Sequence, residues 1–243
     1  EFHVIIHGRT KEKADSTLND IHKITSSESL SSVYADLSSL NQVRNLTENI
    51  LKNYSTLDVL INNAGIYMKE RMLSEDGYEM TFAVNHLSHF LLTNLLLDLL
   101  KQSNDGRIVN VSSVAHQNAK LDWNNLNAEK SFSAYGAYSL SKLGNVLFSN
   151  ELAMRLKGTN LKSNSLHPGV ITTKLLRAGF NISGASVKKG AETSVFLASS
   201  EEVAHLNGEY LIDSKVVKPH PSATDNEVLK KFWQVSEEMT ALN

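Results

Sequence analysis

Short runs of β-branched and aliphatic residues alternate along the chain with longer stretches in which apolar residues recur at helical spacing. The short runs predict strands at residues 2–6, 33–36, 57–61, 108–111 and 164–167. The longer stretches predict helices at residues 11–24, 40–51, 78–100 and 137–156, and at 225–242 after a loop marked by Pro219 and Pro221. This alternation predicts βαβ units, and hence a parallel sheet with helices on both faces.

The pattern places the chain in the α/β class, with a doubly wound, mostly parallel, Rossmann-like sheet. Residues 59–61 and 108–111 are almost continuously apolar, which is typical of parallel strands covered on both faces. No repeat, linker or low-complexity tract divides the 243 residues, so we expect a single domain over residues 1–243. Ligands of such sheets bind beyond the carboxyl ends of the strands, where the candidate chemistry is therefore sought.

Composition excludes several classes of function. The 24 basic and 26 acidic side chains give a net charge of −2, which leaves no basic face for nucleic acid. The absence of cysteine excludes disulfides and thiolate chemistry and favours the cytoplasm. The longest apolar stretch, residues 90–100, contains polar residues and is too short to span a bilayer, so no membrane segment is expected in this chain. His86 and His89 lack a third ligand at metal spacing, and we interpret them as packing residues of a helix rather than a metal site.

Two predicted strands end in small or hydroxyl-bearing residues. The strand at 57–61 is followed by Asn62-Asn63-Ala64-Gly65, where small residues let the backbone approach a ligand and Gly65 tolerates a positive φ. The strand at 108–111 is followed by Ser112 and Ser113. An ordinary strand-to-loop turn and a helix N-cap explain these residues equally well when each is considered alone.

The predicted helix at 137–156 carries Tyr138 and Lys142 four positions apart, and therefore on one face. An ammonium beside a phenol favours the phenolate and lowers the tyrosine pKa toward the range useful for acid–base catalysis. A chance pair on a solvated helix face is the alternative. Tyr135 is a competing phenol, but it lies about two turns away from Lys142.

In their order along the chain, these pieces resemble the short-chain dehydrogenase/reductase family. The matching pieces are Asn62-Asn63-Ala64-Gly65, Asn85 after Val84, Ser113 after Ser112, Tyr138 with Lys142, and His167-Pro168-Gly169. Within the family the chain is similar to the retinol-dehydrogenase-like and WW-domain-oxidoreductase-like branch. The similarity lies in the helix that carries Tyr138 and Lys142, in the interval of 25 positions from Ser113 to Tyr138, and in the ending around residues 208–211. The resemblance covers nearly the whole chain.

The resemblance implies a role for each catalytic candidate. Tyr138 is the general acid in carbonyl reduction and the base in alcohol oxidation. Lys142 lowers the pKa of Tyr138 and binds the ribose of a nicotinamide coenzyme. Ser113, rather than Ser112, stabilises the reacting oxygen. Asn85 holds a water in a proton relay to Lys142; its alternative role is that of a buried amide that ties a helix to a strand.

The resemblance also implies a coenzyme site, in which Asp36 contacts the adenine. The other expected contacts lie on the ribose and pyrophosphate side, at Asn63, Ala64 and Gly65, and around the nicotinamide, at Pro168, Gly169, Ile171 and Thr173. At the end of the first predicted strand Gly8 offers no carboxylate to a ribose 2′-hydroxyl, whereas Arg9 can pair with a 2′-phosphate. We therefore predict that the coenzyme is NADP (NADPH).

The chain departs from the family at its first strand, turn and helix. Only 12 glycines occur, none of them in a G-x-G arrangement, so we expect the glycine-rich turn that seats the pyrophosphate, with its strand and helix, to be missing from this chain. In the family's strand order that strand is central, between those at residues 2–6 and 57–61. The chain is then either part of a longer functional enzyme, which we favour because the catalytic candidates are intact, or a natural truncation.

Two functions follow. The first is an NADP-dependent oxidoreductase that interconverts an alcohol and a carbonyl, on a lipophilic small molecule if the apolar residues after Thr173 line its site: Leu175, Leu176, Phe180 and Ile182. The second is a weak or inactive dehydrogenase fold that acts as an interaction module. The resemblance also implies a homodimer built on apolar faces of the helices at 78–100 and 137–156, although some relatives are monomers or membrane-bound.

Overall fold

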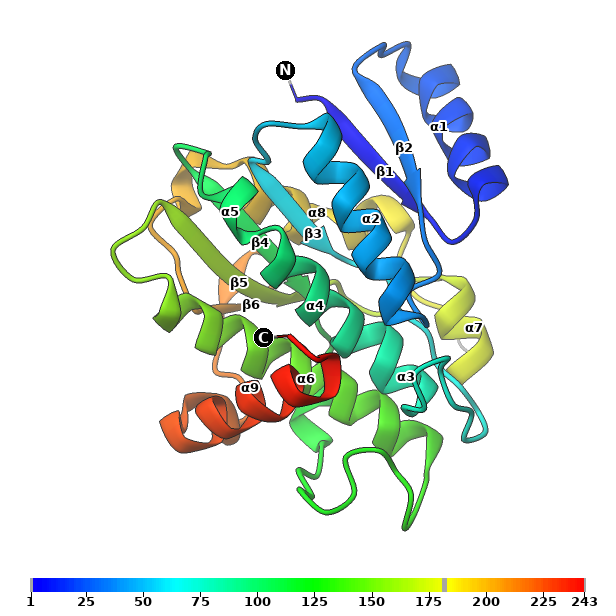
Figure 1. Cartoon of the computed structure of the whole chain (residues 1–243), viewed down its shortest axis with the longest axis vertical. Coiled ribbons are helices and arrows are strands. Elements are labelled where there is room, and N and C mark those ends of the chain that lie inside the picture. Colours follow the sequence, from blue (N-terminus) through cyan, green and yellow to red (C-terminus); the bar gives the residue numbers. More distant parts are fainter. Residues whose placement is uncertain (1, 181–182, 243) are drawn as a thin grey trace.

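Five strands form the main sheet of the computed structural model, which describes residues 2–180 and 183–242. They are, in spatial order, β3 (Val59–Asn62), β4 (Gly106–Val111), β5 (Leu161–His167), β6 (Tyr210–Ile212) and β7 (Lys215–Val216). Strands β3 to β6 run parallel, and β7 is antiparallel to β6 (Figure 1). Strand β4 is buried along its whole length, as its apolar run predicts.

A second, two-stranded parallel sheet holds β1 (Val4–Gly8) and β2 (Leu30–Tyr34), which are joined by α1 (Lys11–Thr25). In the described part of the chain no strand ladder connects β1 to β3. The facing edges instead line a common cleft, where Val4 is 47% and Ile61 is 42% exposed. The predicted Rossmann-like fold with a mostly parallel sheet is confirmed, and its hydrogen-bonded ladders fall into two groups with a cleft between them.

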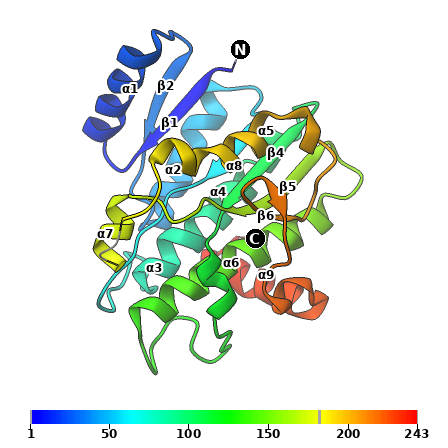
Figure 2. The same ribbon diagram turned by 180° about the vertical axis from the view of Figure 1, so that it is seen from behind.

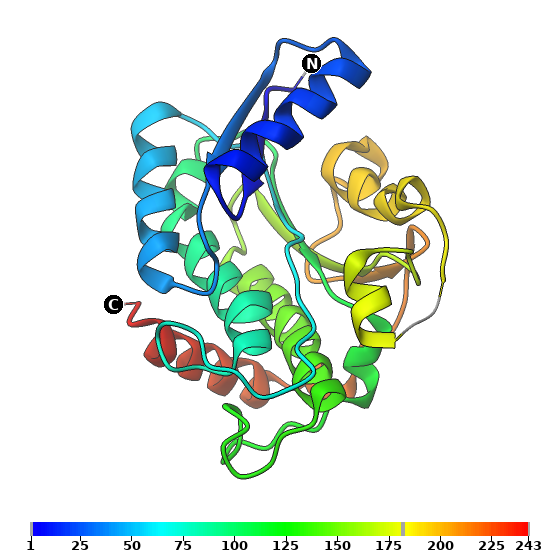
Figure 3. The same cartoon turned by 90° about the vertical axis from the view of Figure 1, so that its right-hand side faces the viewer.

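Helices cover both faces of the main sheet. Helices α4 (Ser88–Leu95) and α6 (Ala134–Arg155) lie on one face together with α2 (Leu40–Asn53), and α8 (Val187–Ser199) lies on the other (Figures 2 and 3). Leucine and phenylalanine side chains fill the space between α4, α6 and the sheet, and Phe90 and Phe148 are completely or almost completely buried there. None of the helices in the described ranges is both long enough and apolar enough to cross a membrane.

The predicted helix at residues 78–100 is divided into several pieces. It consists of α3 (Met80–Phe82), a π-helical turn η1 (Ala83–Leu87), α4 and α5 (Leu97–Leu100). Glu79 begins the segment by accepting hydrogen bonds from the backbone N–H groups of Thr81 and Phe82. Leu96, with φ −96° and ψ 0°, separates α4 from α5. Periodicity alone does not show a one-residue π insertion, so the sequence predicts one continuous helix here.

The C-terminal helix α9 (Asn226–Thr240) packs along α6 (Figure 1). Helix α9, the sheet and other elements together bury every residue of α6 from Ala137 to Ala153, and α2 and α9 also contact α4. This differs from the prediction that these helices keep apolar faces free for a second subunit, because elements of the same chain cover them. His86 packs against Phe232 of α9 and bonds to Ser236, as expected for a packing histidine.

Candidate active site

The cleft between the two sheets collects the candidate residues. It has a volume of about 2000 Å³ and opens at the carboxyl ends of β1, β3, β4 and β5. All but one of the candidates line it: Arg9, Asp36, Asn63, Ala64, Gly65, Ser113, Tyr138, Lys142, Pro168, Gly169, Ile171 and Thr173. The exception is Asn85, which is completely buried beneath the loop after β3. Positions up to 164 residues apart in sequence, from Arg9 to Thr173, therefore meet in one site.

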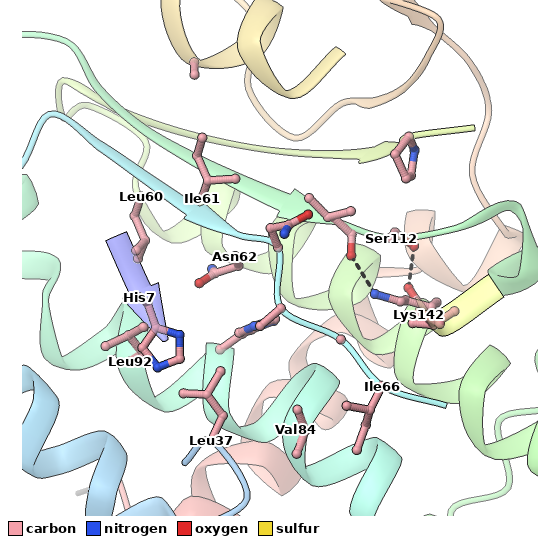
Figure 4. Close-up of a pocket in the computed structure, with 18 of the residues that line it drawn as sticks. His7, Leu37, Leu60, Ile61, Asn62, Ile66, Val84, Leu92, Ser112 and Lys142 are labelled. Atoms are coloured by element: carbon pink, nitrogen blue, oxygen red, sulfur yellow. Dashed lines mark hydrogen bonds between the residues drawn. The ribbon is translucent and has the colours of Figure 1, made fainter. Parts of the chain in front are cut away.

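Tyr138 and Lys142 lie on the first turns of α6. The helix begins there because Ser133 caps it and accepts a hydrogen bond from the N–H of Gly136. The Lys142 ammonium lies 5.8 Å from the centre of the Tyr138 ring. It donates a hydrogen bond of 3.0 Å to the carbonyl of Val111, at the end of β4. This bond fixes Lys142 against the strand end (Figure 4).

Burial dominates the protonation of this pair. It lowers the pKa of the Lys142 ammonium to about 8. It also raises the pKa of the Tyr138 phenol, against the opposing effect of a hydrogen bond with the Ser113 side chain. The net shift of the Tyr138 pKa is thus opposite to the one expected from Lys142, because desolvation outweighs the hydrogen bond with Ser113. At neutral pH the phenol keeps its proton, as a proton donor must.

The structure distinguishes the two serines that follow β4. The Ser112 hydroxyl is buried and donates a hydrogen bond of 2.7 Å to the carbonyl of Lys142, so its role is structural (Figure 4). The Ser113 hydroxyl faces Tyr138 and accepts a bond of 3.2 Å from the N–H of Ala115. Its backbone begins the short helix η2 (Val114–Asn118). Ser113 is therefore the serine that can hydrogen-bond a reacting oxygen beside the phenol.

Asn85 lies in the π-helical turn η1, and its side-chain amide ties three segments together. The amide oxygen accepts from the N–H of Ile66 at 2.8 Å, and the amide nitrogen donates to the Ile66 carbonyl and to Ser141, both at 3.0 Å. These contacts describe the alternative that the sequence left open, a buried amide that fixes the loop after β3 to α6. The water relay stays a prediction.

At Gly65 the loop after β3 passes close to Lys142. A Cβ at this position would lie 3.4 Å from Oδ1 of Asn85 and 3.5 Å from Nζ of Lys142. The positive φ suggested for Gly65 does not occur; Gly169, with φ +93°, is the glycine of the predicted site that needs it. Asn62 begins the loop and donates to Thr93 and Asn110, which fixes β3 against α4 and β4.

Arg9 and Asp36 were expected to contact the coenzyme separately, but they contact each other. Arg9 Nε donates to Asp36 Oδ2 at 2.8 Å, and a terminal nitrogen lies 2.7 Å from the same oxygen. Burial alone would raise the pKa of the Asp36 carboxyl, but hydrogen bonds from Ser38 and Arg9 outweigh it and lower the pKa. The pair closes the end of the cleft at β1 and β2.

The segment after β5 forms the opposite wall of the cleft. Ile171 is buried and bridges to Ala185, and Thr173 caps α7 (Lys174–Phe180) by accepting from the N–H of Leu176. Leu175 and Leu176 line the cleft, as the apolar pattern suggested. Ile182 and the side chain of Phe180 lie outside the part of the chain that the structure describes.

Tyr67 is a neighbour of Tyr138 that sequence reasoning missed. Its ring lies 5.5 Å from that of Tyr138, at an interplanar angle of 53°. The only signal in the sequence is its position two residues after Gly65. A single tyrosine in a loop predicts no such contact, because the contact depends on how the loop turns back toward α6.

Comparison with known proteins agrees with this geometry. A family model described as short chain dehydrogenase matches residues 1–181. Human retinol dehydrogenase 14 is 47% identical over 220 residues, which cover 85% of this chain and 66% of that protein; the chain thus spans about two thirds of this relative's length. Human retinol dehydrogenase 13 is 38% identical over 98% of the chain and 77% of its own length.

Two solved structures show the same fold. A putative uncharacterized protein from Mycobacterium Paratuberculosis is 31% identical, with a TM-score of 0.81 over 98% of this chain and 84% of its own. A gluconate 5-dehydrogenase from Burkholderia cenocepacia J2315, solved with NADP and tartrate, is 20% identical, with a TM-score of 0.68 over 86% of this chain and 82% of its own. Together with the order and meeting of the motifs, these findings show that the chain belongs to the short-chain dehydrogenase family, in its retinol-dehydrogenase-like branch.

Proposed function

We propose that the protein is an NADP-dependent oxidoreductase that interconverts an alcohol and a carbonyl on a lipophilic small molecule. The observation that carries this proposal is the meeting of Ser113, Tyr138 and Lys142 at the end of β4, inside one cleft. Each of these side chains supplies one element of acid–base chemistry at a single oxygen atom. Alcohol/carbonyl oxidoreduction is also the activity that the family membership supports.

In the reducing direction Tyr138 donates its phenolic proton to the oxygen of the substrate. Ser113 donates a hydrogen bond to the same oxygen and stabilises the negative charge that develops there. The ammonium of Lys142, held by Val111, stabilises the phenolate that remains. In the oxidising direction the phenolate takes the proton back, so the pair serves both directions.

The described residues fit a nicotinamide coenzyme. Gly65 leaves space for a ligand beside Lys142, and Oδ1 of Asn62, buried at the cleft without a hydrogen-bond partner in the described ranges, is available as an acceptor. The coenzyme supplies or accepts the hydride. Along the cleft we assign its adenine end to Asp36 and Arg9, and its nicotinamide end to the loop from Pro168 to Thr173.

Arg9 supports the preference for NADP. Its side chain is largely exposed, and its guanidinium already pairs with the carboxylate of Asp36. The guanidinium can therefore leave Asp36 to bind a 2′-phosphate, or bind the carboxylate and the phosphate together. No carboxylate stands at Gly8 to hold a free 2′-hydroxyl. An affinity for NAD equal to or tighter than that for NADP would refute this assignment.

The proposal of a lipophilic substrate has two supports. Leu175 and Leu176 place apolar surface at the cleft beside the nicotinamide end. Two of the similar proteins named above are retinol dehydrogenases, and retinol is a lipophilic alcohol. A cytoplasmic location and a homodimer stay predictions.

The test measures turnover of aldehydes, ketones and retinoids by the full-length protein and by its Tyr138→Phe variant. We expect the variant to lose about 100-fold or more in kcat, because it has no proton to donate. Tyr135→Phe is the matched control, since it removes a more exposed phenol from the same helix, and it should retain most of the activity. Equal rates for Tyr138→Phe and the unmodified protein would remove Tyr138 from the mechanism.

A non-catalytic interaction module is the second candidate. Two observations favour it: the edges of β1 and β3 along the cleft have no strand partner among the described residues, and the 243 residues contain no G-x-G turn. For the oxidoreductase we propose the opposite explanation of these edges, in which a strand outside this chain pairs with both of them in the active enzyme. A folded full-length protein that neither binds NADP nor turns over any member of the substrate panel would support the interaction module instead.

A further inference from the structure

His116 lies completely buried in η2, three residues after Ser113. Its Nδ1 is 2.6 Å from the backbone carbonyl of Ser113. Its Nε2 accepts a hydrogen bond of 3.1 Å from the backbone N–H of His220, which caps the short helix η4 (Pro221–Thr224). One imidazole therefore joins the turn that carries the candidate catalytic serine to a segment 104 positions further along the chain.

These two contacts determine the tautomer of the His116 ring. A backbone N–H can only donate and a carbonyl can only accept, so Nε2 must be bare and Nδ1 must carry the proton. A protonated ring would direct an Nε2–H at the N–H of His220 and break that bond. Burial lowers the pKa of His116, which keeps the ring neutral at physiological pH.

Of the polar groups that face the His116 ring, His220 opposes a charge on it and the Ser113 carbonyl favours one, and burial outweighs the effect of that carbonyl. His220 faces Nε2, and its own Nδ1 is occupied as an acceptor from the N–H of Ser222 at 3.2 Å. The Tyr210 ring from β6 meets the imidazole edge to face at 4.6 Å. A charge on His116 would in turn lower the pKa of His167, at the end of β5. No carboxylate of the described residues bonds to the His116 ring or is credited with stabilising its charge.

A second bond strengthens the same connection. Gln117 donates from its side-chain amide to the carbonyl of Lys218 at 3.1 Å, so two successive residues of η2 hold the segment before η4. The Ser113 carbonyl also accepts from the backbone N–H of His116 at 3.1 Å, so this carbonyl receives two bonds from one residue. The orientation of the Ser113 peptide, and with it the direction of its hydroxyl, thus depends on His116.

We infer that His116 is a positioning residue: through its neutral Nδ1–H it holds Ser113 where the serine hydroxyl can meet Tyr138 and the reacting oxygen. This inference rests on the proposed function, because it assigns His116 a role in that same reaction. Loss of the ring should lower kcat more than it raises KM, because Ser113 acts on charge that develops during the reaction.

Three variants of the full-length protein test the inference. His116→Asn keeps an amide donor close to the position of Nδ1, whereas His116→Gln places its amide closer to Nε2; His116→Ala keeps neither. We expect His116→Ala and His116→Gln to lose about 10- to 100-fold in kcat with little change in KM. His116→Asn should recover most of that loss. If the Asn and Gln variants lose equal amounts of kcat, in proportion to their loss of stability, the role of His116 is merely structural.

Two further measurements separate this inference from the proposed function. Ser113→Ala should abolish turnover; if it does so while His116→Ala retains full kcat, His116 has no positioning role and the proposed function stands. If Ser113→Ala is fully active, the roles assigned to Ser113 and His116 both fail; the proposed function itself fails only if the unmodified protein turns over no member of the substrate panel. Nitrogen NMR of the imidazole tests the contact without turnover: a neutral ring protonated at Nδ1 is expected at pH 7, and an Nε2–H tautomer would overturn the inference.

Discussion

Replacing Lys142 by methionine should abolish turnover and yet stabilise the fold at neutral pH. The side chain is 3% exposed, and burial lowers the pKa of its ammonium from 10.5 to about 8. A shift of about 2.5 pH units means that holding the proton costs the folded state about 3 kcal/mol relative to the unfolded chain. Methionine has a similar length and carries no charge, so the variant avoids this cost.

The hydrogen bond that the substitution removes offsets part of the gain. Lys142 donates to the carbonyl of Val111 at 3.0 Å, and such a bond from a charged donor contributes about 1.5–3 kcal/mol. The carbonyl keeps a partner in the variant, because the side chain of Asn145 also donates to it at 3.1 Å. We therefore expect a net gain of up to about 1.5 kcal/mol in the free energy of unfolding at pH 7.

The sign of the pH dependence gives the sharper test. Between pH 8 and 10.5 the unfolded wild-type chain holds the lysine proton and the folded chain does not, so wild-type stability rises with pH relative to the variant. The advantage of Lys142→Met should fall by about 3 kcal/mol across this window, measured by urea denaturation at pH 7 and pH 10. Lys120→Met, at an exposed lysine, is the control. A stability difference that is the same at both pH values would refute the reasoning.

Two further predictions concern the helical core. Burial lowers the pKa of both His86 and His89 to about 3. The stability that their neutral forms provide should therefore be complete above pH 6.5 and be lost as the pH falls toward 3. The expected loss in the free energy of unfolding is up to about 1.4 kcal/mol per pH unit for each histidine. Urea denaturation at pH 7 and pH 5 checks this, and equal stability at the two values would contradict it. Gly144→Ala would place a Cβ 3.0 Å from the ring of His86 and 3.1 Å from that of Phe232, and should destabilise the fold by about 1–3 kcal/mol. An unchanged melting temperature would show that these rings move aside freely.

The sequence predicts the repeating elements well, because periodicity reports burial directly. Helix α1 ends within a residue of its predicted limit, and β4 begins two residues before its own. The segment at 78–100 is predicted as one helix because a π insertion changes the hydrogen-bond spacing without changing the apolar pattern. The covering of α6 by α9 was missed for another reason: an apolar helix face does not reveal which element will cover it.

For the site, the sequence predicts which residues meet but not how they are bonded. Tyr138 and Lys142 share a helix face at any burial, so their spacing was sufficient to pair them. The sign of the Tyr138 pKa shift depends on desolvation, which only the packed fold determines. The ion pair between Arg9 and Asp36 joins the ends of two strands, and neither residue's neighbours in sequence indicate it.

Helix α6 shows how the site is held, and this determines how the Lys142 variant will be interpreted. Three of its buried polar side chains bond to other parts of the fold: Ser141 to the amide of Asn85, and Lys142 and Asn145 to the end of β4. Apolar residues at these positions would pack with less desolvation cost, but they would leave the loop after β3 and the end of β4 without these bonds to the helix. Because Asn145 keeps its bond to the Val111 carbonyl when Lys142 is replaced, β4 should stay fixed to α6 and Ser113 should stay in place. A loss of turnover in a stabilised Lys142→Met protein would therefore report the missing ammonium and not a displaced serine.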